Sequence, residues 1–181
     1  MNGGGGALRA IFLDRDGVLI EAIVRGNKPY AATTPEEVHI IAGVPQACQA
    51  LAALGFVLVM TTNQPDVPRG KIARSFVEDT NAALARTLGL DDVEVCYHDN
   101  ADDCACRKPR PGLMVQAAQK LGLDLAGSIV VGDRWRDIEA GHKAGCKTVF
   151  IDYGYDEALT RAPDHVAPSL PAAMPWIESQ V

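Results

Sequence analysis

Residues 10–18, with the sequence AIFLDRDGV, decide how this chain can fold. Four apolar residues in a row, with no polar residue between them, are typical of a short strand that is buried on both faces of a sheet. Directly after them the sequence turns polar, with Asp14 and Asp16 on either side of Arg15. Gly17 follows, and a glycine lets the chain turn sharply without a side chain in the way. We therefore expect a buried strand that carries two carboxylates at its carboxyl end.

Similar apolar runs recur along the chain and alternate with stretches of helical periodicity. We expect strands at residues 10–13, 56–60, 93–95, 128–131 and 147–151, with a short edge strand at 165–167. We expect helices at residues 42–54, 70–88, 111–121, 135–144 and 170–178. Buried strands separated by helices indicate an α/β fold, a doubly wound and mainly parallel sheet with helices on both faces. Ligands of such sheets bind outside the carboxyl ends of the strands.

Length and composition are those of one globular domain. The chain has 181 residues, of which 48% are hydrophobic and 22% charged, and a net charge of −6. We assign residues 9–181 to a single domain and the glycine-rich residues 1–8 to a flexible leader. The acidic charge argues against general binding to nucleic acid or to an anionic membrane. No apolar run approaches the roughly 18 residues of a membrane-spanning helix, and the start lacks the pattern of an export signal. We therefore expect a cytoplasmic protein. We also expect a monomer, although no sequence pattern here bears on the oligomeric state.

Polar residues follow two further strands at the same expected edge of the sheet. Thr62, Asn63 and Gln64 come after the second strand, where a hydroxyl and free backbone amides could hold phosphate oxygens. Asp133 comes after the fourth strand and could bind Mg²⁺, which prefers one or two carboxylates. Lys108 could neutralise phosphate charge. Each feature alone would also fit a turn or a helix cap, but their order along the sheet indicates a phosphate site.

These motifs resemble those of the haloacid dehalogenase-like (HAD) superfamily of phosphatases, over residues 14–137. The resemblance implies a Rossmann-like fold in which Asp14 is the nucleophile that forms an aspartyl-phosphate and Asp16 is the general acid and base. It implies that Thr62 and Lys108 hold the phosphoryl group in transfer. It also implies a catalytic Mg²⁺, whose ligands would be the Asp14 carboxylate, the Asp16 backbone carbonyl and Asp133, with Asp137 supporting.

Members of this superfamily normally set their substrate choice with cap insertions. The segment between Asp16 and Gly43 is too short for a cap domain, and the segment between Asn63 and Cys96 has room for only one helix and its strand. We therefore expect an enzyme without a cap domain and with an open site. Residues 23–34, which include Arg25 and Lys28, should form part of its rim.

A second group of residues has the ligands and spacing of a metal site. The spacing is C-x-H-x5-C-x-C, made by Cys96, His98, Cys104 and Cys106. Three thiolates and one imidazole are a typical ligand set for structural Zn²⁺, with no coordination position left open. A disulfide is disfavoured because cytosolic thiols stay reduced, and a loop of free thiols is the remaining alternative. We expect a zinc-binding loop at residues 96–106.

With this loop the chain resembles a capless subgroup that contains D-glycero-D-manno-heptose-1,7-bisphosphate 7-phosphatases and histidinol-phosphatases. The similarity lies in the motifs around Asp14, Thr62 and Asp133 and in the Cys/His loop followed by Arg107-Lys108-Pro109. It implies that the substrate is bound by Asn63, Gln64, Arg107 and Arg134. Of these, Arg107 would contact the substrate beyond its reacting phosphate, and Arg134 would line the same mouth.

The expected partner is a small phosphorylated metabolite, foremost a heptose 1,7-bisphosphate cleaved at its 7-phosphate. The alternatives are histidinol phosphate or another small sugar or polyol phosphate. A zinc-stabilised module that binds a phosphorylated ligand without turnover is the non-enzyme alternative. The presence of both Asp14 and Asp16 weighs against it, since a binding module has no need of two catalytic carboxylates.

Overall fold

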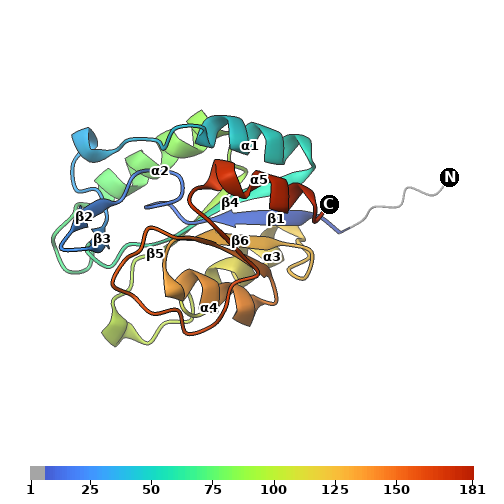
Figure 1. Ribbon diagram of the computed structural model, residues 1–181. Helices are drawn as coiled ribbons and strands as arrows, with labels where there is room; N and C mark the ends of the chain where they lie inside the picture. Colours follow the sequence, from blue (N-terminus) through green and yellow to red (C-terminus); the bar gives the residue numbers. More distant parts are fainter. Residues whose placement is uncertain (1–6) are drawn as a thin grey trace.

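Strand β1 (Arg9–Leu13) lies in the interior of a six-stranded sheet in the computed structural model, which describes residues 7–181. The strand order is β5-β4-β1-β6-β7-β8, and every neighbouring pair is parallel (Figure 1). The other strands of this sheet are β4 (Phe56–Asn63), β5 (Asp92–Cys96), β6 (Ile129–Gly132), β7 (Lys147–Ile151) and β8 (His165–Ala167).

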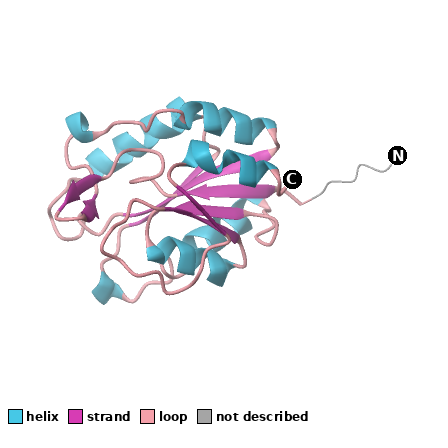
Figure 2. Cartoon of the chain, in the orientation of Figure 1, coloured by secondary structure: helices cyan, strands magenta, loops and turns pink. Residues whose placement is uncertain are grey.

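Five α-helices cover the sheet on both faces (Figure 2). They are α1 (Val44–Ala53), α2 (Arg74–Leu88), α3 (Gly112–Leu121), α4 (Trp135–Ala144) and α5 (Leu170–Glu178). Helices α1, α2 and α5 lie on one face, and α3 and α4 lie on the other (Figure 1). The predicted doubly wound α/β fold is therefore confirmed. Within the described residues no helix is both long and apolar enough to cross a membrane.

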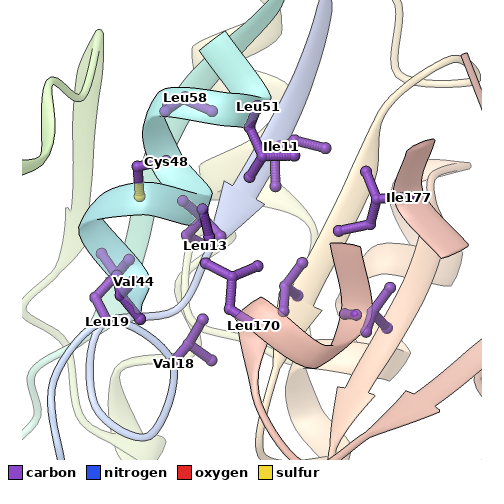
Figure 3. Close-up of a cluster of buried hydrophobic side chains, with 14 of the residues drawn as sticks. Ile11, Leu13, Val18, Leu19, Val44, Cys48, Leu51, Leu58, Leu170 and Ile177 are labelled. Carbon is purple, nitrogen blue, oxygen red and sulfur yellow. The ribbon is translucent and has the colours of Figure 1, made fainter. Parts of the chain in front are cut away.

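Alternate side chains of β1 pack into different cores, because successive side chains of a strand point to opposite faces. Ile11 and Leu13 pack with α1 and α5 in one cluster, whereas Phe12 belongs to the cluster under α3 and α4. Figure 3 shows the first cluster, with Leu51 of α1 and Ile177 of α5 facing β1. All five side chains are fully buried, and each such burial contributes about 1.5–3 kcal/mol. This two-sided burial explains why the strand sequence is continuously apolar.

The order of the strands reverses at β1. The chain passes from β1 through α1 to β4 on one side, and it later returns through α3 to β6 on the other side. The backbone N–H of Asp14 donates to the carbonyl oxygen of Val131 at 3.0 Å, which ties the end of β1 to β6. A crevice forms at such a reversal, outside the carboxyl ends of the strands. The polar residues that follow β1, β4 and β6 therefore meet there.

A small hairpin, β2 (Ile23–Arg25) and β3 (Lys28–Tyr30), stands at the end of the sheet opposite the C-terminus (Figure 1). The sequence did not predict it, because its strands are short and largely exposed and so carry no apolar alternation. Its turn residues Gly26 and Asn27 both have positive φ, as in a type I′ hairpin turn. The hairpin and the 3-10 turn η1 (Pro35–Glu37) are the only regular elements described between β1 and α1, so no cap domain is present in this part of the chain.

Two boundaries differ from the expected ones by more than two residues. Strand β4 extends to Asn63, because pairing with β5 continues along Thr61–Asn63, so these polar residues belong to the strand itself. Helix α2 begins at Arg74 rather than at residue 70, since residues 64–72 form a series of turns. Of the expected leader, residues 1–6 lie outside the described residues, and Leu8 forms an isolated bridge with Leu123.

Candidate active site

A pocket of about 300 Å³ opens at the carboxyl ends of β1, β4 and β6. It brings together nearly all the residues that the sequence placed at the site. They are Asp14, Asp16, Thr62, Asn63, Arg107, Lys108, Asp133, Arg134 and Asp137. Gln64 is the exception, since it is buried and does not line the pocket.

The ammonium group of Lys108 is buried among oxygen atoms. Its Nζ lies 2.9 Å from Oδ1 of Asp14, 2.5 Å from Oδ1 of Asp137 and 2.9 Å from the carbonyl oxygen of Thr61. The backbone of Lys108 is held as well, because its N–H donates to Oδ1 of Asn63 at 3.1 Å and its carbonyl accepts from Nδ2 of Asn63 at 3.1 Å. The lysine charge is therefore fixed beside the Asp14 carboxylate.

Three carboxylates surround this single ammonium. One oxygen from each of Asp14, Asp133 and Asp137 lies within 4.8 Å of the others. Burial, partly offset by the charge of Lys108, raises the pKa of Asp14 to about 6. Burial and then the Asp14 charge raise the pKa of Asp133 well above its usual value. Both carboxylate oxygens of Asp133 are buried without a hydrogen-bond partner among the described residues. A hard divalent cation prefers oxygen ligands, and the excess of buried negative charge and the unpaired carboxylate oxygens suit such an ion.

Gly17 lets the chain pass close to Asp133. Its φ is +86°, a conformation that side-chain-bearing residues rarely adopt. A Cβ atom at this position would overlap Oδ2 of Asp133. The Gly17 carbonyl accepts a hydrogen bond from the Tyr153 hydroxyl at 3.0 Å. The glycine is therefore required both for the turn and for the position of a candidate metal ligand.

Asp16 is oriented by Arg15, a residue to which the sequence assigned no role. The Arg15 side chain is 1% exposed, and its Nε and Nη2 donate to the two oxygens of Asp16 at 3.0 and 3.3 Å. Its Nη1 donates to Oδ1 of Asn81 on α2 at 3.2 Å. Gln64 lies behind the pocket and donates to Asp16 Oδ2 at 3.3 Å and to Thr62 Oγ1 at 2.8 Å. These contacts direct the Asp16 carboxyl towards the pocket.

The four predicted zinc ligands lie together in the loop after β5. Their sulfur atoms are 3.2–3.7 Å apart. Nδ1 of His98 lies 3.6 Å from Cys96 Sγ and 3.3 Å from Cys106 Sγ. A tetrahedral Zn²⁺ with Zn–S bonds of about 2.3 Å requires sulfur–sulfur distances of about 3.8 Å and slightly shorter nitrogen–sulfur distances. The observed distances are somewhat shorter than these, and the donor set is compatible with a single Zn²⁺.

The same loop also orients Arg107. The Arg107 backbone N–H donates to Cys104 Sγ at 3.3 Å, and its Nε donates to Oδ1 of Asn100 at 2.9 Å. Its Nη1 donates to the carbonyl oxygen of His98 at 3.3 Å. The guanidinium is thus held by the cysteine loop while it lines the pocket.

Arg134 lines the pocket, but its charge is neutralised. Its guanidinium donates to both carboxylate oxygens of Glu157, with the Nε contact at 2.6 Å. No local pattern links these two residues, because Glu157 lies in the loop between β7 and β8.

The hairpin forms part of the pocket rim, as expected from the sequence. Pro29, Tyr30 and Ala31 line the pocket. The two basic residues of the hairpin do not line it, and Arg25 instead points to Glu37 at 4.0 Å. The hairpin therefore supplies shape at this rim, and the charge comes from other segments.

Comparison with known proteins agrees with this geometry. A family model described as HAD-hydrolase-like matches residues 105–173. The D-glycero-beta-D-manno-heptose-1,7-bisphosphate 7-phosphatase of Yersinia pestis is 33% identical over 180 residues, which cover 93% of this chain and 88% of the relative. The enzyme of the same name from Pasteurella multocida is 37% identical over 158 residues, with 81% and 83% coverage. The chain belongs to the HAD-like family of phosphatases.

A solved structure of this family shows the same fold. The crystal structure of D,D-heptose 1,7-bisphosphate phosphatase from B. bronchiseptica, complexed with magnesium and phosphate, matches with a TM-score of 0.83 at 28% identity. The match covers 96% of this chain and 100% of that chain. The predicted resemblance to HAD phosphatases and the predicted hydrolase class are both confirmed.

We expect Gly17→Ala to reduce phosphatase activity towards p-nitrophenyl phosphate by about 10²-fold, because the added methyl group displaces Asp133 and a shift of about 1 Å can cost this much. Gly26→Ala is the matched control, since Gly26 also has a positive φ but a Cβ there has nothing within 4 Å. Backbone strain should cost Gly26→Ala about 1–2 kcal/mol of folding stability, measured by urea unfolding. Gly17→Ala should lose at least as much, because Asp133 must also move. Equal activity of the two variants would contradict this role of Gly17.

Proposed function

We propose that this protein is a Mg²⁺-dependent phosphatase that cleaves the 7-phosphate of D-glycero-D-manno-heptose 1,7-bisphosphate through an aspartyl-phosphate at Asp14. The observation that carries the proposal is the Asp14 carboxylate held 2.9 Å from the buried Lys108 ammonium at the strand-order reversal. The substrate is supported by the names of relatives that are 33% and 37% identical over most of the chain.

Mg²⁺ would be held by the carboxylates of Asp14 and Asp133 and by the backbone carbonyl of Asp16. Asp137 would support this set, because its carboxylate contacts Lys108 and accepts a hydrogen bond from the backbone N–H of Arg134 at 3.1 Å. When bound, the ion supplies charge neutralisation for the phosphoryl oxygens. The unpaired Asp133 oxygens support this assignment, and so does the magnesium in the B. bronchiseptica structure.

In the first step, a carboxylate oxygen of Asp14 forms a bond to phosphorus while the ester P–O bond of the substrate breaks. Asp16 donates its proton to the leaving sugar oxygen, which departs as an alcohol. Lys108 and the Thr62 hydroxyl hold the transferring phosphoryl oxygens. Because phosphoryl transfer depends mainly on position and charge neutralisation, a lysine fixed by three oxygen contacts suits this role.

In the second step, the Asp16 carboxylate accepts a proton from water as the water oxygen attacks phosphorus. The bond between phosphorus and Asp14 breaks, inorganic phosphate leaves, and both aspartates return to their starting states. Arg15 and Gln64 keep Asp16 on the pocket side for both steps. Binding of substrate by Asn63, Gln64, Arg107 and Arg134 stays a prediction, and the hydrogen bonds of Asn63 and Gln64 support a positioning role for these two.

Zn²⁺ bound by Cys96, His98, Cys104 and Cys106 would have a structural role. The loop is polar and includes a single 3-10 turn, η2 (Asn100–Asp102), so it has little apolar surface with which to order itself. Metal binding can supply that folding energy. The loop leads directly into Arg107 and Lys108, so its order would set the position of both side chains.

We expect Asp14→Asn to abolish turnover and Asp16→Asn to lower kcat by about 10²–10⁴-fold, the usual loss of general acid–base help. With p-nitrophenyl phosphate, whose leaving group needs little protonation, Asp16→Asn should release a rapid burst of about one p-nitrophenolate per enzyme, because its phosphoenzyme lacks the base that hydrolyses it. Stopped-flow absorbance measures the burst. Asp79→Asn on the exposed face of α2 is the control and should behave like the wild type. A burst from Asp14→Asn would contradict the assigned nucleophile.

We expect about one Zn²⁺ per chain by elemental analysis, and about 10- to 100-fold lower kcat/KM after chelation in reducing buffer and resupply of Mg²⁺ alone. Circular dichroism should show that the helices persist. Cys104→Ser should lose zinc, whereas Cys146→Ala, at a buried cysteine outside the cluster, should keep it. Less than about half an equivalent of zinc in the untreated protein would contradict the site.

A phosphate-release assay across phosphorylated metabolites tests the substrate. We expect the heptose 1,7-bisphosphate to have the highest kcat/KM of a panel that includes heptose 7-phosphate and histidinol phosphate. The expected margin over histidinol phosphate is about 10-fold or more, because a second phosphate adds charge-assisted hydrogen bonds. A higher kcat/KM for histidinol phosphate would refute the proposed substrate and leave the aspartyl-phosphate mechanism intact.

A further inference from the structure

Two guanidinium groups lie on a wall between the active-site pocket and a second pocket of about 390 Å³. The shared wall contains Asn100, Arg107, Lys108 and Arg136. Arg136 was not assigned a role from the sequence, and it takes no part in the mechanism above. The second pocket therefore adjoins the active-site pocket at these four residues.

Most of the basic side chains around the two pockets already have a carboxylate partner. The pairs are Arg69 with Asp66 and Asp99, Lys108 with Asp14 and Asp137, Arg110 with Asp103, Arg134 with Glu157, and Lys143 with Glu139. Arg107 and Arg136 form no salt bridge within residues 7–181. Arg107 donates only to neutral oxygens, and the buried Nε of Arg136 has no hydrogen-bond partner in this part of the chain.

The position of Arg136 is unfavourable for a cation in the free protein. It is the second residue of α4, where the positive end of the helix dipole disfavours positive charge. Arg134 and Arg107 line the same pocket and place further positive charge around it. The Arg136 Cζ atom lies 5.8 Å from the centroid of the Trp135 ring, a cation–π contact that contributes only about 0.5–1 kcal/mol. The stability of the fold therefore does not account for this arginine.

We infer that Arg136, together with Arg107, binds the second, non-reacting phosphate of the substrate and so sets the preference for a bisphosphate. A dianionic phosphate between the two guanidiniums would accept hydrogen bonds from both and neutralise both charges, and a guanidinium can bind phosphate in bidentate fashion. A substrate with a cationic amine at this end would meet two arginines instead, which disfavours it. The inference rests on the proposed bisphosphate substrate.

The test compares kcat and KM for heptose 1,7-bisphosphate and heptose 7-phosphate, which differ only in the second phosphate. Arg136→Gln should raise KM for the bisphosphate about 10- to 100-fold with little change in kcat, as expected for loss of a charged hydrogen-bonding partner. Its kcat/KM for the monophosphate should change less than about 3-fold. Arg136→Lys, which keeps a charge without the bidentate fork, should recover part of the loss. Arg86→Gln, the same change at an exposed site on α2, should match the wild type on both substrates.

Two different results would count against the inference, and they are distinguishable. If the wild type itself showed no preference for the bisphosphate, the proposed substrate would be wrong and the inference with it. If the wild type preferred the bisphosphate and Arg136→Gln affected both substrates equally or neither, the inference alone would be wrong. Thermal unfolding by circular dichroism checks that the variants fold. If Arg136→Gln does not fold, Arg136→Lys takes its place. A KM raised for the bisphosphate alone would support the inference, and an equal effect on both substrates, or none, would overturn it.

Discussion

The buried contact of the Lys108 ammonium with Asp14 and Asp137 is the interaction on which the rest of the site depends. Such charges are costly to remove from water, and the cost is offset only when each is paired in good geometry. The partners come from three different segments: the end of β1, helix α4 and the loop before α3. The parallel sheet supplies this convergence, because its strand order reverses at β1 and the three segments meet in one crevice. A fold that placed β4 and β6 on the same side of β1 could not assemble the same charges.

The cysteine loop links this arrangement around Lys108 to Arg107, the residue proposed to bind the far end of the substrate. It holds the Arg107 side chain through Asn100 and the His98 carbonyl, and it leads directly into Lys108. The same loop therefore positions Lys108, which is proposed to neutralise the reacting phosphate, and Arg107, which is proposed to contact the far end of the substrate. With no cap domain described between β1 and α1, part of the wall of the site comes instead from this loop and from the β2–β3 hairpin, and the loop that carries Glu157 holds Arg134 in place. Short surface segments of this kind can change without disturbing the sheet.

Particular residues show where sequence-based reasoning worked and where it did not. The strand ending at Leu13 and the carboxylates at Asp14 and Asp133 were predicted, because apolar runs and the polar residues that follow them are local patterns. The clustering of Cys96, His98, Cys104 and Cys106 was also predicted, since all four lie within residues 96–106 at a spacing typical of a zinc site. Arg134 illustrates the opposite case. The sequence placed it correctly at the pocket, but its neutralisation by Glu157 involves a residue in another loop.

The sequence alone thus predicted the fold class, the edge of the sheet where the candidate site lies and the Cys/His cluster after β5, because each depends on residues that are close together in the chain. Only the tertiary structure decided how the charges pair. It shows that Arg15 faces Asp16 and Asn81, and that Arg136 lacks a partner among the described residues. The physical reason is that an ion pair is set by distance and burial in space, and its members lie on segments that local pattern does not connect. An arginine in a sequence is a charge, and its surroundings in the fold decide whether that charge is already neutralised or still available to a ligand.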